Sequence, residues 1–294
     1  MRSALCSLLV VLCAIVSEAA VPRVQRVYLV VLENTSYGSV VGSSSMPYLN
    51  SLASKYGLAV KYYGNTHPSI GNYFMLTTGQ ILTNNDATTN TYDVNNVVRR
   101  LITAGKTWKV YAESLPYTGY IGGDKYPYIK HHNPFVYFTD VRNSSVQRNN
   151  VVPFTQFPTD RKNGALPNYS FLVPNNQHNM HDCPPGMSSC TLAQKAKAAD
   201  DWLKSNIAPL VNSSAFQQSG DILIITWDEG FATDKAYGGG HIAWVVVSSK
   251  ARKGYHSGTF HQHQSTLKLT LKALGVYSYP GASQTATDMG ELFP

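Results

Sequence analysis

The sequence predicts an α/β protein with a mostly parallel central sheet, helices on both faces and a loop-rich cap. Two largely apolar runs, 27–32 and 221–227, favour this fold because β-branched runs of this kind are typical of strands buried on both faces. Stretches with the 3.6-residue spacing of amphipathic helices lie between the apolar runs. This alternation indicates parallel strands joined by helical crossovers.

The predicted elements follow one another along the whole chain. Strands are expected at 27–32, 58–63, 109–112, 169–173, 221–227 and 242–247. Helices are expected at 46–56, 93–104, 192–210 and 265–274, where apolar side chains recur on one face. Residues 116–157 are rich in Gly, Pro, Tyr and Asn and too long for an ordinary connection, so we expect them to form a functional cap.

Segment 66–79 is a polar turn that runs into an apolar stretch and stops at Gly79. This pattern predicts a loop that leads into a short helix, with Ser69 near the helix N-terminus. The unpaired backbone N–H groups there favour an anion, and a serine in that place can attack phosphorus. The alternative is that Ser69 only caps the helix, since serine is a common N-cap.

Composition bounds the class of protein. The chain has 294 residues, 43% hydrophobic and 14% charged, which excludes an extended disordered protein and allows one large domain. Residues 1–20 fit a secretory signal, because Arg2 precedes the apolar run 4–16 and small residues follow it. We therefore expect a secreted protein with a single domain over 21–294. No later segment is apolar over a length that would predict a membrane span.

Two cysteines, Cys183 and Cys190, follow the predicted signal. In an oxidising compartment their short spacing favours a disulfide. The other two cysteines, Cys6 and Cys13, lie in the predicted signal, so none remains to complete a thiolate metal site. Sequons for N-glycosylation stand at Asn34, Asn143, Asn168 and Asn212.

The formal net charge is +7, which favours anionic partners such as phosphate esters, acidic lipid headgroups or nucleic acid. Lysine and arginine form no dense block, so nucleic acid is not the leading candidate. A small phosphate ester or a phospholipid headgroup is the expected substrate.

Oxygen ligands follow two of the predicted strands. Glu33 and Asn34 come after the first strand, and Asp228 and Glu229 come after the strand at 221–227. Buried carboxylates without partners are costly, and a divalent cation would remove that cost. The alternative is that these residues cap the helices that follow.

Histidines form the second clue to a site, because several of them stand near predicted strand ends or in the cap. They are His131, His132, His178, His181, His241, His261 and His263. A single histidine is most often a surface or core residue, whereas a group spread over several strand ends indicates a shared site.

Six ordered motifs resemble the phosphoesterase family of acid phosphatases and phospholipases C, distant relatives of the alkaline phosphatases. They are Glu33-Asn34-Thr35-Ser36-Tyr37, the segment 66–79, His132-Asn133-Pro134-Phe135, Asn179-Met180-His181-Asp182, Trp227-Asp228-Glu229-Gly230 and Gly239-Gly240-His241. The resemblance covers nearly the whole predicted domain and implies an alkaline-phosphatase-like fold.

The resemblance also implies roles for single residues. Ser69 matches the nucleophile, and Asn72 matches an asparagine that contacts a phosphate oxygen. The metal-binding positions match Glu33, Asn34, Ser69, Asp228 and Glu229. His132 and His181 match catalytic histidines that line the phosphate pocket, and His241 and His263 match further substrate-binding positions.

One departure concerns the metal count. Relatives usually carry aspartate where this chain has Asn179, so we expect one divalent ion per chain, of a kind that the sequence leaves open. Histidines would then bind phosphate and move protons, which suits activity at acidic pH.

The expected enzyme is a metal-dependent acid phosphatase that acts on phosphomonoesters through a phosphoserine intermediate. The alternatives are a phosphodiesterase of the phospholipase C type and a secreted binding protein that has lost catalysis. A carboxyl-ester hydrolase is disfavoured, because Ser69 lacks the Gly-x-Ser-x-Gly elbow.

Overall fold

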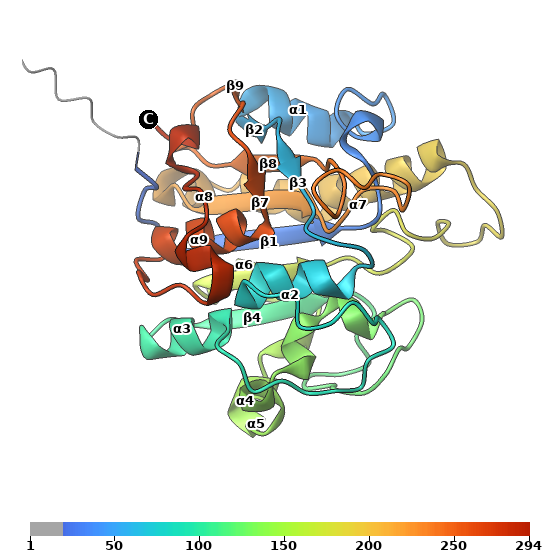
Figure 1. Cartoon of the computed structure of the whole chain (residues 1–294). Coiled ribbons are helices and arrows are strands. Elements are labelled where there is room, and N and C mark those ends of the chain that lie inside the picture. Colours follow the sequence, from blue (N-terminus) through green and yellow to red (C-terminus); the bar gives the residue numbers. More distant parts are fainter. Residues whose placement is uncertain (1–19) are drawn as a thin grey trace, which may run out of the picture.

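In the computed structural model, which describes residues 20–294, a large mixed sheet forms the centre of the molecule (Figure 1). The predicted signal segment, 1–20, lies outside the described residues apart from Ala20. The eight strands of the sheet are ordered β5-β4-β6-β1-β7-β8-β2-β9. They are β1 (Val27–Leu32), β2 (Gly57–Ala59), β4 (Trp108–Ala112), β5 (Val151–Pro153), β6 (Tyr169–Val173), β7 (Ile222–Trp227), β8 (Trp244–Val247) and β9 (Tyr255–Ser257).

The prediction of a mostly parallel sheet is confirmed. Within this sheet β8 alone runs against its neighbours β7 and β2, and the other pairs are parallel. Every residue of β1, β6, β7 and β8 is buried, as expected of strands covered on both faces.

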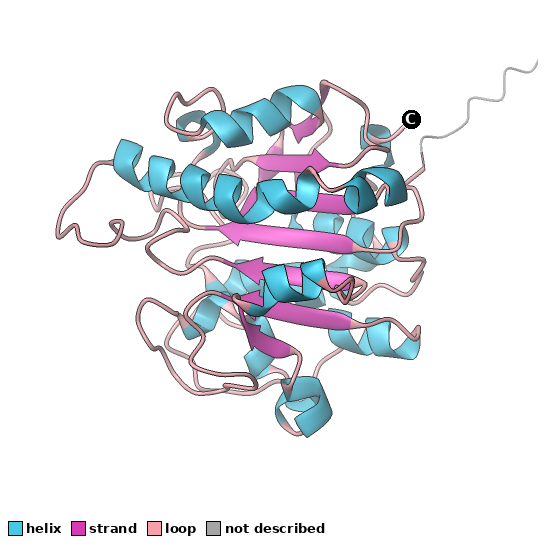
Figure 2. Ribbon diagram, turned by 180° about the vertical axis from the view of Figure 1, so that it is seen from behind, coloured by secondary structure: helices cyan, strands magenta, loops and turns pink. Residues whose placement is uncertain are grey.

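Helices cover both faces of the sheet. On the face toward the viewer in Figure 1 lie α2 (Ile70–Thr78) and α9 (His263–Ala273), with α3 (Val97–Thr103) against α9. Figure 2 shows the opposite face, which is crossed by the long α7 (Leu192–Val211) with α1 (Pro47–Lys55) and α8 (Ser214–Ser219) against it. None of the helices between residues 20 and 294 combines the length and apolar character that a membrane span requires.

The expected strand at 58–63 is two strands. Residues 57–59 form β2 of the main sheet, whereas β3 (Tyr62–Tyr63) pairs with β10 (His261–Gln262) in a small second sheet. The chain turns at Val60 and Lys61, and Lys61 is exposed. A short apolar run does not reveal such a turn, because its periodicity is the same on both sides of it.

The segment expected as a cap contains several short helices. They are the 3₁₀ helices η2 (Lys130–His132) and η3 (Pro134–Tyr137), followed by α4 (Thr139–Arg142) and α5 (Ser145–Arg148). Both 3₁₀ helices pack against α2. The end of the segment differs from the prediction, because β5 is an edge strand of the main sheet and α6 (Gln156–Lys162) begins inside the expected cap.

The N-terminus of α1 is capped from a distant part of the chain. Met46 precedes the helix and its side chain makes no capping bond. Instead the carboxylate of Asp200 in α7 accepts hydrogen bonds of 2.8 Å from the backbone N–H groups of both Tyr48 and Leu49. Asp200 is 3% exposed, so its loss would leave two helix-terminal donors buried.

We expect Asp200→Ala to lower the free energy of unfolding by about 1–3 kcal/mol, the usual cost of buried donors left without an acceptor. The measurement is urea unfolding followed by circular dichroism. Asp201→Ala is the matched control, because Asp201 is the next residue of α7 and makes only a surface ion pair with Lys197. Equal midpoints for the two variants would contradict the role given to Asp200.

Candidate active site

Ser69 stands immediately before α2, and its side chain does not cap the helix. Within the described residues the serine makes no capping bond to α2, and Asp86 Oδ1 instead accepts the N–H of Ile70 at 2.9 Å. The Ser69 hydroxyl donates to Glu33 Oε2 at 3.1 Å. The capping interpretation is therefore wrong, and the hydroxyl faces the carboxyl ends of the central strands.

Glu33, the first residue after β1, is fully buried and receives two hydroxyl groups. Ser69 donates to one carboxylate oxygen, and the phenol of Tyr73 donates to the other. Burial raises the pKa of Glu33 well above its usual range, and the nearby charge of Asp228 raises it further. A carboxylate in this position requires either a proton or a cation close to it.

Asn34 and Asp228 supply two oxygen atoms that lack partners. Asn34 adopts a φ of 46°, a left-handed conformation that asparagine tolerates, and its N–H donates to Asp228 Oδ1 at 3.1 Å. Among the described residues, neither Asn34 Oδ1 nor Asp228 Oδ2 has a hydrogen-bond partner, although both atoms are buried. Unpaired buried oxygens are rare, so this pair indicates a ligand.

Glu229 and Asn72 are held by other groups. Glu229 Oε1 lies 3.2 Å from His67 Nδ1, and Asn72 Nδ2 donates to Glu229 Oε2 at 3.2 Å. The same Asn72 amide accepts the N–H of Asn65 at 2.8 Å and donates to Thr66 O at 2.9 Å. The predicted roles of Glu229 in metal binding and of Asn72 in phosphate binding stay predictions, and these contacts favour a role in shaping the loop before Ser69.

His132 lies beside Glu33, and its catalytic role stays a prediction. Its Nε2 is 3.3 Å from Glu33 Oε1, and its ring stacks on Tyr73 with centroids 5.4 Å apart. Burial lowers the pKa of His132 well below its usual range, as does the charge of His131, so the ring is neutral. His132 comes from the segment predicted to be a cap, and this segment therefore contributes a side chain to the site.

His181 comes from the loop after β6 and is 40% exposed. Its Nδ1 lies 2.7 Å from Asp182 Oδ1, and its N–H donates to the side chain of Asn179 at 2.9 Å. The rings of His181 and His132 lie 6.4 Å apart. The structure thus brings both predicted catalytic histidines to the same side of the site.

The rings of His241 and His263 are engaged by other side chains and by backbone carbonyls. His241 is stacked between Tyr37 and Tyr63, with centroids 4.3 and 4.8 Å away, and its Nε2 lies 2.9 Å from Val60 O. His263 is fully buried below the site, with Nε2 2.5 Å from Asp228 O and Nδ1 3.2 Å from the Tyr62 hydroxyl. Burial lowers the pKa of His263 to about 4. These contacts favour structural support over contact with substrate.

Three glycines, Gly64, Gly239 and Gly240, hold the loop before Ser69 against the loop that follows Asp228. Gly64 N donates to Gly240 O at 2.9 Å, and Gly239 N donates to Gly64 O at 3.1 Å. A Cβ atom on Gly64 would lie 2.8 Å from Gly239 O and 2.9 Å from Asp228 O. Only a residue without a side chain permits this close approach of the two loops.

The donor set fits a divalent cation. No group of three or more His, Cys, Asp or Glu within residues 20–294 is arranged as a metal site. The set here is of another kind, because it combines the amide oxygen of Asn34 and the hydroxyl of Ser69 with the carboxylates of Glu33 and Asp228. Oxygen donors of this type suit a hard cation, which would satisfy both unpaired oxygens.

Sequence reasoning missed three residues of the site. His67 holds Glu229, Tyr73 holds Glu33, and Asp86 caps α2. The first two lie inside segment 66–79, and the hydroxyl of Tyr73 in the apolar part of that segment was an available signal. Asp86 stands in a loop of asparagines and threonines, where a single carboxylate gives no such signal.

Comparison with known proteins decides the family. The family model described as "Phosphoesterase family" matches residues 42–277. The chain belongs to the phosphoesterase family. The predicted family is thereby confirmed, and so is the prediction of an enzyme that hydrolyses phosphoric esters.

Two relatives are 30% identical to this phosphoesterase. One, a phosphatidylinositol-3-phosphatase of Mycobacterium tuberculosis, matches over 256 residues, 86% of this chain and 78% of the relative. The other, an acid phosphatase of Aspergillus fumigatus, matches over 255 residues, 82% of this chain. A probable acid phosphatase of Kluyveromyces lactis is 28% identical over 86% of this chain. The chain spans 53% and 59% of the lengths of these two fungal relatives.

Solved structures confirm the alkaline-phosphatase-like fold. A protein of the alkaline phosphatase superfamily from Vibrio parahaemolyticus has a TM-score of 0.62 at 14% identity, covering 86% of this chain and 67% of its own. A lipoteichoic acid synthase of Listeria monocytogenes has a TM-score of 0.60 at 13% identity, covering 86% of this chain and 72% of its own. Identities this low show the fold alone.

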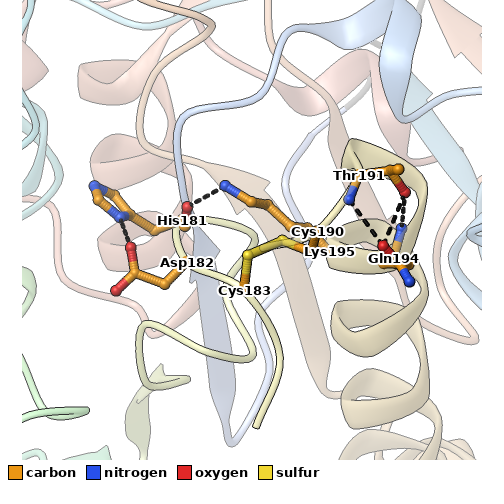
Figure 3. The surroundings of a disulfide bond; sticks show 7 residues. All are labelled: His181, Asp182, Cys183, Cys190, Thr191, Gln194 and Lys195. Carbon is orange, nitrogen blue, oxygen red and sulfur yellow. Dashed lines mark hydrogen bonds and ion pairs between the residues drawn. A yellow bond between two sulfur atoms is a disulfide. The ribbon is translucent and has the colours of Figure 1, made fainter. Parts of the chain in front are cut away.

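The predicted disulfide is present and lies beside His181 (Figure 3). Cys183 and Cys190 close a loop that begins two residues after His181, and Thr191 then starts α7 through a capping box with Gln194. From the first turn of α7, Lys195 Nζ donates to the carbonyl of His181 at 2.7 Å. The backbone of His181 is therefore tied to α7 on one side and to the disulfide loop on the other.

We expect the double variant Cys183→Ser, Cys190→Ser to lower the turnover number on a phosphomonoester roughly tenfold, the order typical of groups that orient active-site residues. The denaturant midpoint should change less, because the closed loop is short. Both quantities are measured on the same preparations. Unchanged turnover with a lower midpoint would show that the disulfide only stabilises the fold, and two reactive thiols in the native protein would contradict the bond itself.

Proposed function

We propose that this phosphoesterase is a secreted, metal-dependent acid phosphatase that cleaves phosphomonoesters through a phosphoserine on Ser69. The observation that carries the proposal is the Ser69 hydroxyl, bonded to Glu33 at the start of α2 and close to the unpaired oxygens of Asn34 and Asp228. Secretion rests on the signal pattern of residues 1–20.

The names of the relatives support a phosphomonoester as substrate. The relatives that match over more than four-fifths of this chain are named as a phosphatidylinositol-3-phosphatase and as acid phosphatases. A phosphatase removes a terminal phosphate, so the group that leaves is an alcohol.

In the proposed mechanism Ser69 Oγ attacks phosphorus in line, and the bond from phosphorus to the ester oxygen breaks. Glu33 and the N-terminus of α2 orient the hydroxyl, and the helix end favours the charge on the phosphate. His181 has its Nδ1 fixed by Asp182, which leaves Nε2 to donate a proton to the departing alkoxide. Water then attacks the phosphoserine from the vacated side and releases phosphate.

One divalent cation would be held by Glu33, Asn34, Ser69 and Asp228. When bound, it lowers the pKa of the serine hydroxyl and offsets the charge of the phosphate. Asn179, which stands where relatives usually have aspartate, is buried and uses its side chain inside its own loop, accepting from His181 N and donating to Asn176 Oδ1 at 3.3 Å. This arrangement supports a single ion per chain.

The runner-up functions differ in what they hydrolyse. A phosphodiesterase of the phospholipase C type would prefer a phosphodiester or a phosphocholine lipid to a phosphomonoester. A binding protein that has lost catalysis would hydrolyse none of the three. Rates for these substrates, with and without a chelator, therefore separate the proposals.

We expect Ser69→Ala to abolish turnover and the trapped phosphoenzyme while leaving the fold intact, because the nucleophile itself is removed. Turnover is followed by phosphate release, and the phosphoenzyme by mass spectrometry after an acid quench. Thr77→Ala is the control from the same helix, since its hydroxyl bonds only to carbonyls of that helix. Near-normal turnover in Ser69→Ala would refute the nucleophile.

We expect metal analysis to find about one tightly held divalent ion per chain, by the argument from Asn179. Asp228→Asn and Glu33→Gln should each weaken cation binding and reduce the rise in melting temperature that the metal produces, because a bound ion stabilises only the folded state. Glu113→Gln is the control, since Glu113 bonds to His178 and Asn175 outside the donor set. Two stoichiometric ions in active enzyme would contradict the single site.

A further inference from the structure

A hollow of about 380 Å³ opens beside the candidate site. The residues that line it include Asn34 and His181, which belong to the site, together with Met180, Leu192, Lys195 and Phe231. This volume is at the lower end of the range found for pockets that bind small molecules. The mechanism proposed above leaves this space unused.

The hollow is continuous with the catalytic residues. Asn34 forms part of its wall, and the N–H of Asn34 donates to Asp228. Asn34 also directly follows Glu33, the carboxylate that accepts the Ser69 hydroxyl. His181 forms another part of the wall and is the residue proposed to protonate the leaving group. A group that departs from phosphorus on the side of His181 would therefore enter this space.

The walls of the hollow combine apolar side chains with one cationic side chain. Met180, Phe231 and Leu192 supply apolar surface, and Leu192 is 38% exposed. Lys195 supplies the charge, and no lining residue in the described part of the chain is a carboxylate. Figure 3 shows the Lys195 side chain reaching back along the disulfide to His181 O, a contact that uses one of its three N–H donors. The others can serve a ligand.

We propose that this hollow binds the alcohol part of the phosphate ester, and that it selects an alcohol with an apolar body and a second anionic group that Lys195 contacts. This inference rests on the proposed phosphatase function and adds the class of leaving group to it. Charge complementarity supports this choice, because a cation in a partly apolar wall with no carboxylate among its described lining residues favours an anion.

The first test changes the charge of the hollow at Leu192, the first residue of α7, where aspartate suits the helix N-terminus. The substrates are phenyl phosphate and a naphthyl phosphate that carries a carboxylate on its distal ring. Leu192→Asp should lower kcat/KM about tenfold for the carboxynaphthyl ester, mainly through KM, and by less than about twofold for phenyl phosphate. Ala193→Asp is the matched control, because Ala193 is exposed and does not line the hollow.

The second test removes the cation. Lys195→Met should lower kcat/KM for the carboxynaphthyl ester about tenfold relative to phenyl phosphate, and Lys195→Arg should restore most of it. Lys197→Met is the control, since Lys197 lies on the same helix and pairs with Asp201 at the surface. Equal losses on both substrates in both Leu192→Asp and Lys195→Met would overturn the proposal, and so would no loss on either.

Binding separates this inference from the proposed function. If the wild-type protein hydrolyses no phosphomonoester, the phosphatase proposal fails, and the hollow is judged by titration with naphthalene-1-sulfonate, followed by calorimetry. A Kd at least about fivefold weaker in Leu192→Asp than in Ala193→Asp supports an anion-selective apolar subsite. Equal binding by the two variants, or none by the wild type, overturns it.

Discussion

Two carboxylates buried side by side set the main physical constraint on this structure. Leu32 of β1 and Trp227 of β7 are paired in register, so Glu33 and Asp228 leave the sheet at neighbouring positions. Burial raises the pKa of both, the charge of Asp228 raises that of Glu33 further, and the charge of Glu229 raises that of Asp228. Neither carboxylate has a cation among the described residues in contact with it. The surrounding hydroxyl and amide groups offset part of the cost of burying these two carboxylates.

The groups that compensate the buried carboxylates come from parts of the chain that are distant in sequence. The Ser69 hydroxyl arrives at the start of α2, and the Tyr73 hydroxyl one turn further along. The Asn34 N–H donates to Asp228, and His263 of α9 supports the carbonyl of the same residue from below. These groups compensate the carboxylates only in part, since Asp228 Oδ2 is left without a partner in the described chain. The unsatisfied oxygen is what a bound cation would stabilise.

Sequence reasoning predicted the parts of the fold that depend on local patterns. The strands β1, β6 and β7 were found because buried parallel strands are continuous apolar runs, and Glu33 and Asp228 could be placed together because parallel strands end at one edge. The roles of His241 and His263 could not be judged in this way. His241 ends one of the motifs and His263 was assigned by the resemblance alone. Aromatic stacking and backbone carbonyls engage their rings, and such contacts depend on tertiary packing. The cap that Asp200 of α7 provides for the N-terminus of α1 could not be predicted, for the same reason.

The sequon at Asn34 has a consequence for how this chain is made. Asn34-Thr35-Ser36 satisfies the acceptor pattern, but the Asn34 amide oxygen is buried beside Asp228 and the residue lines the hollow described above. A sugar on that amide would occupy the hollow and remove a proposed metal donor. In a cell that glycosylates its exported proteins, folding of the end of β1 competes with modification of Asn34. The fraction of chains glycosylated at Asn34 thus reports how early this edge of the sheet folds during synthesis.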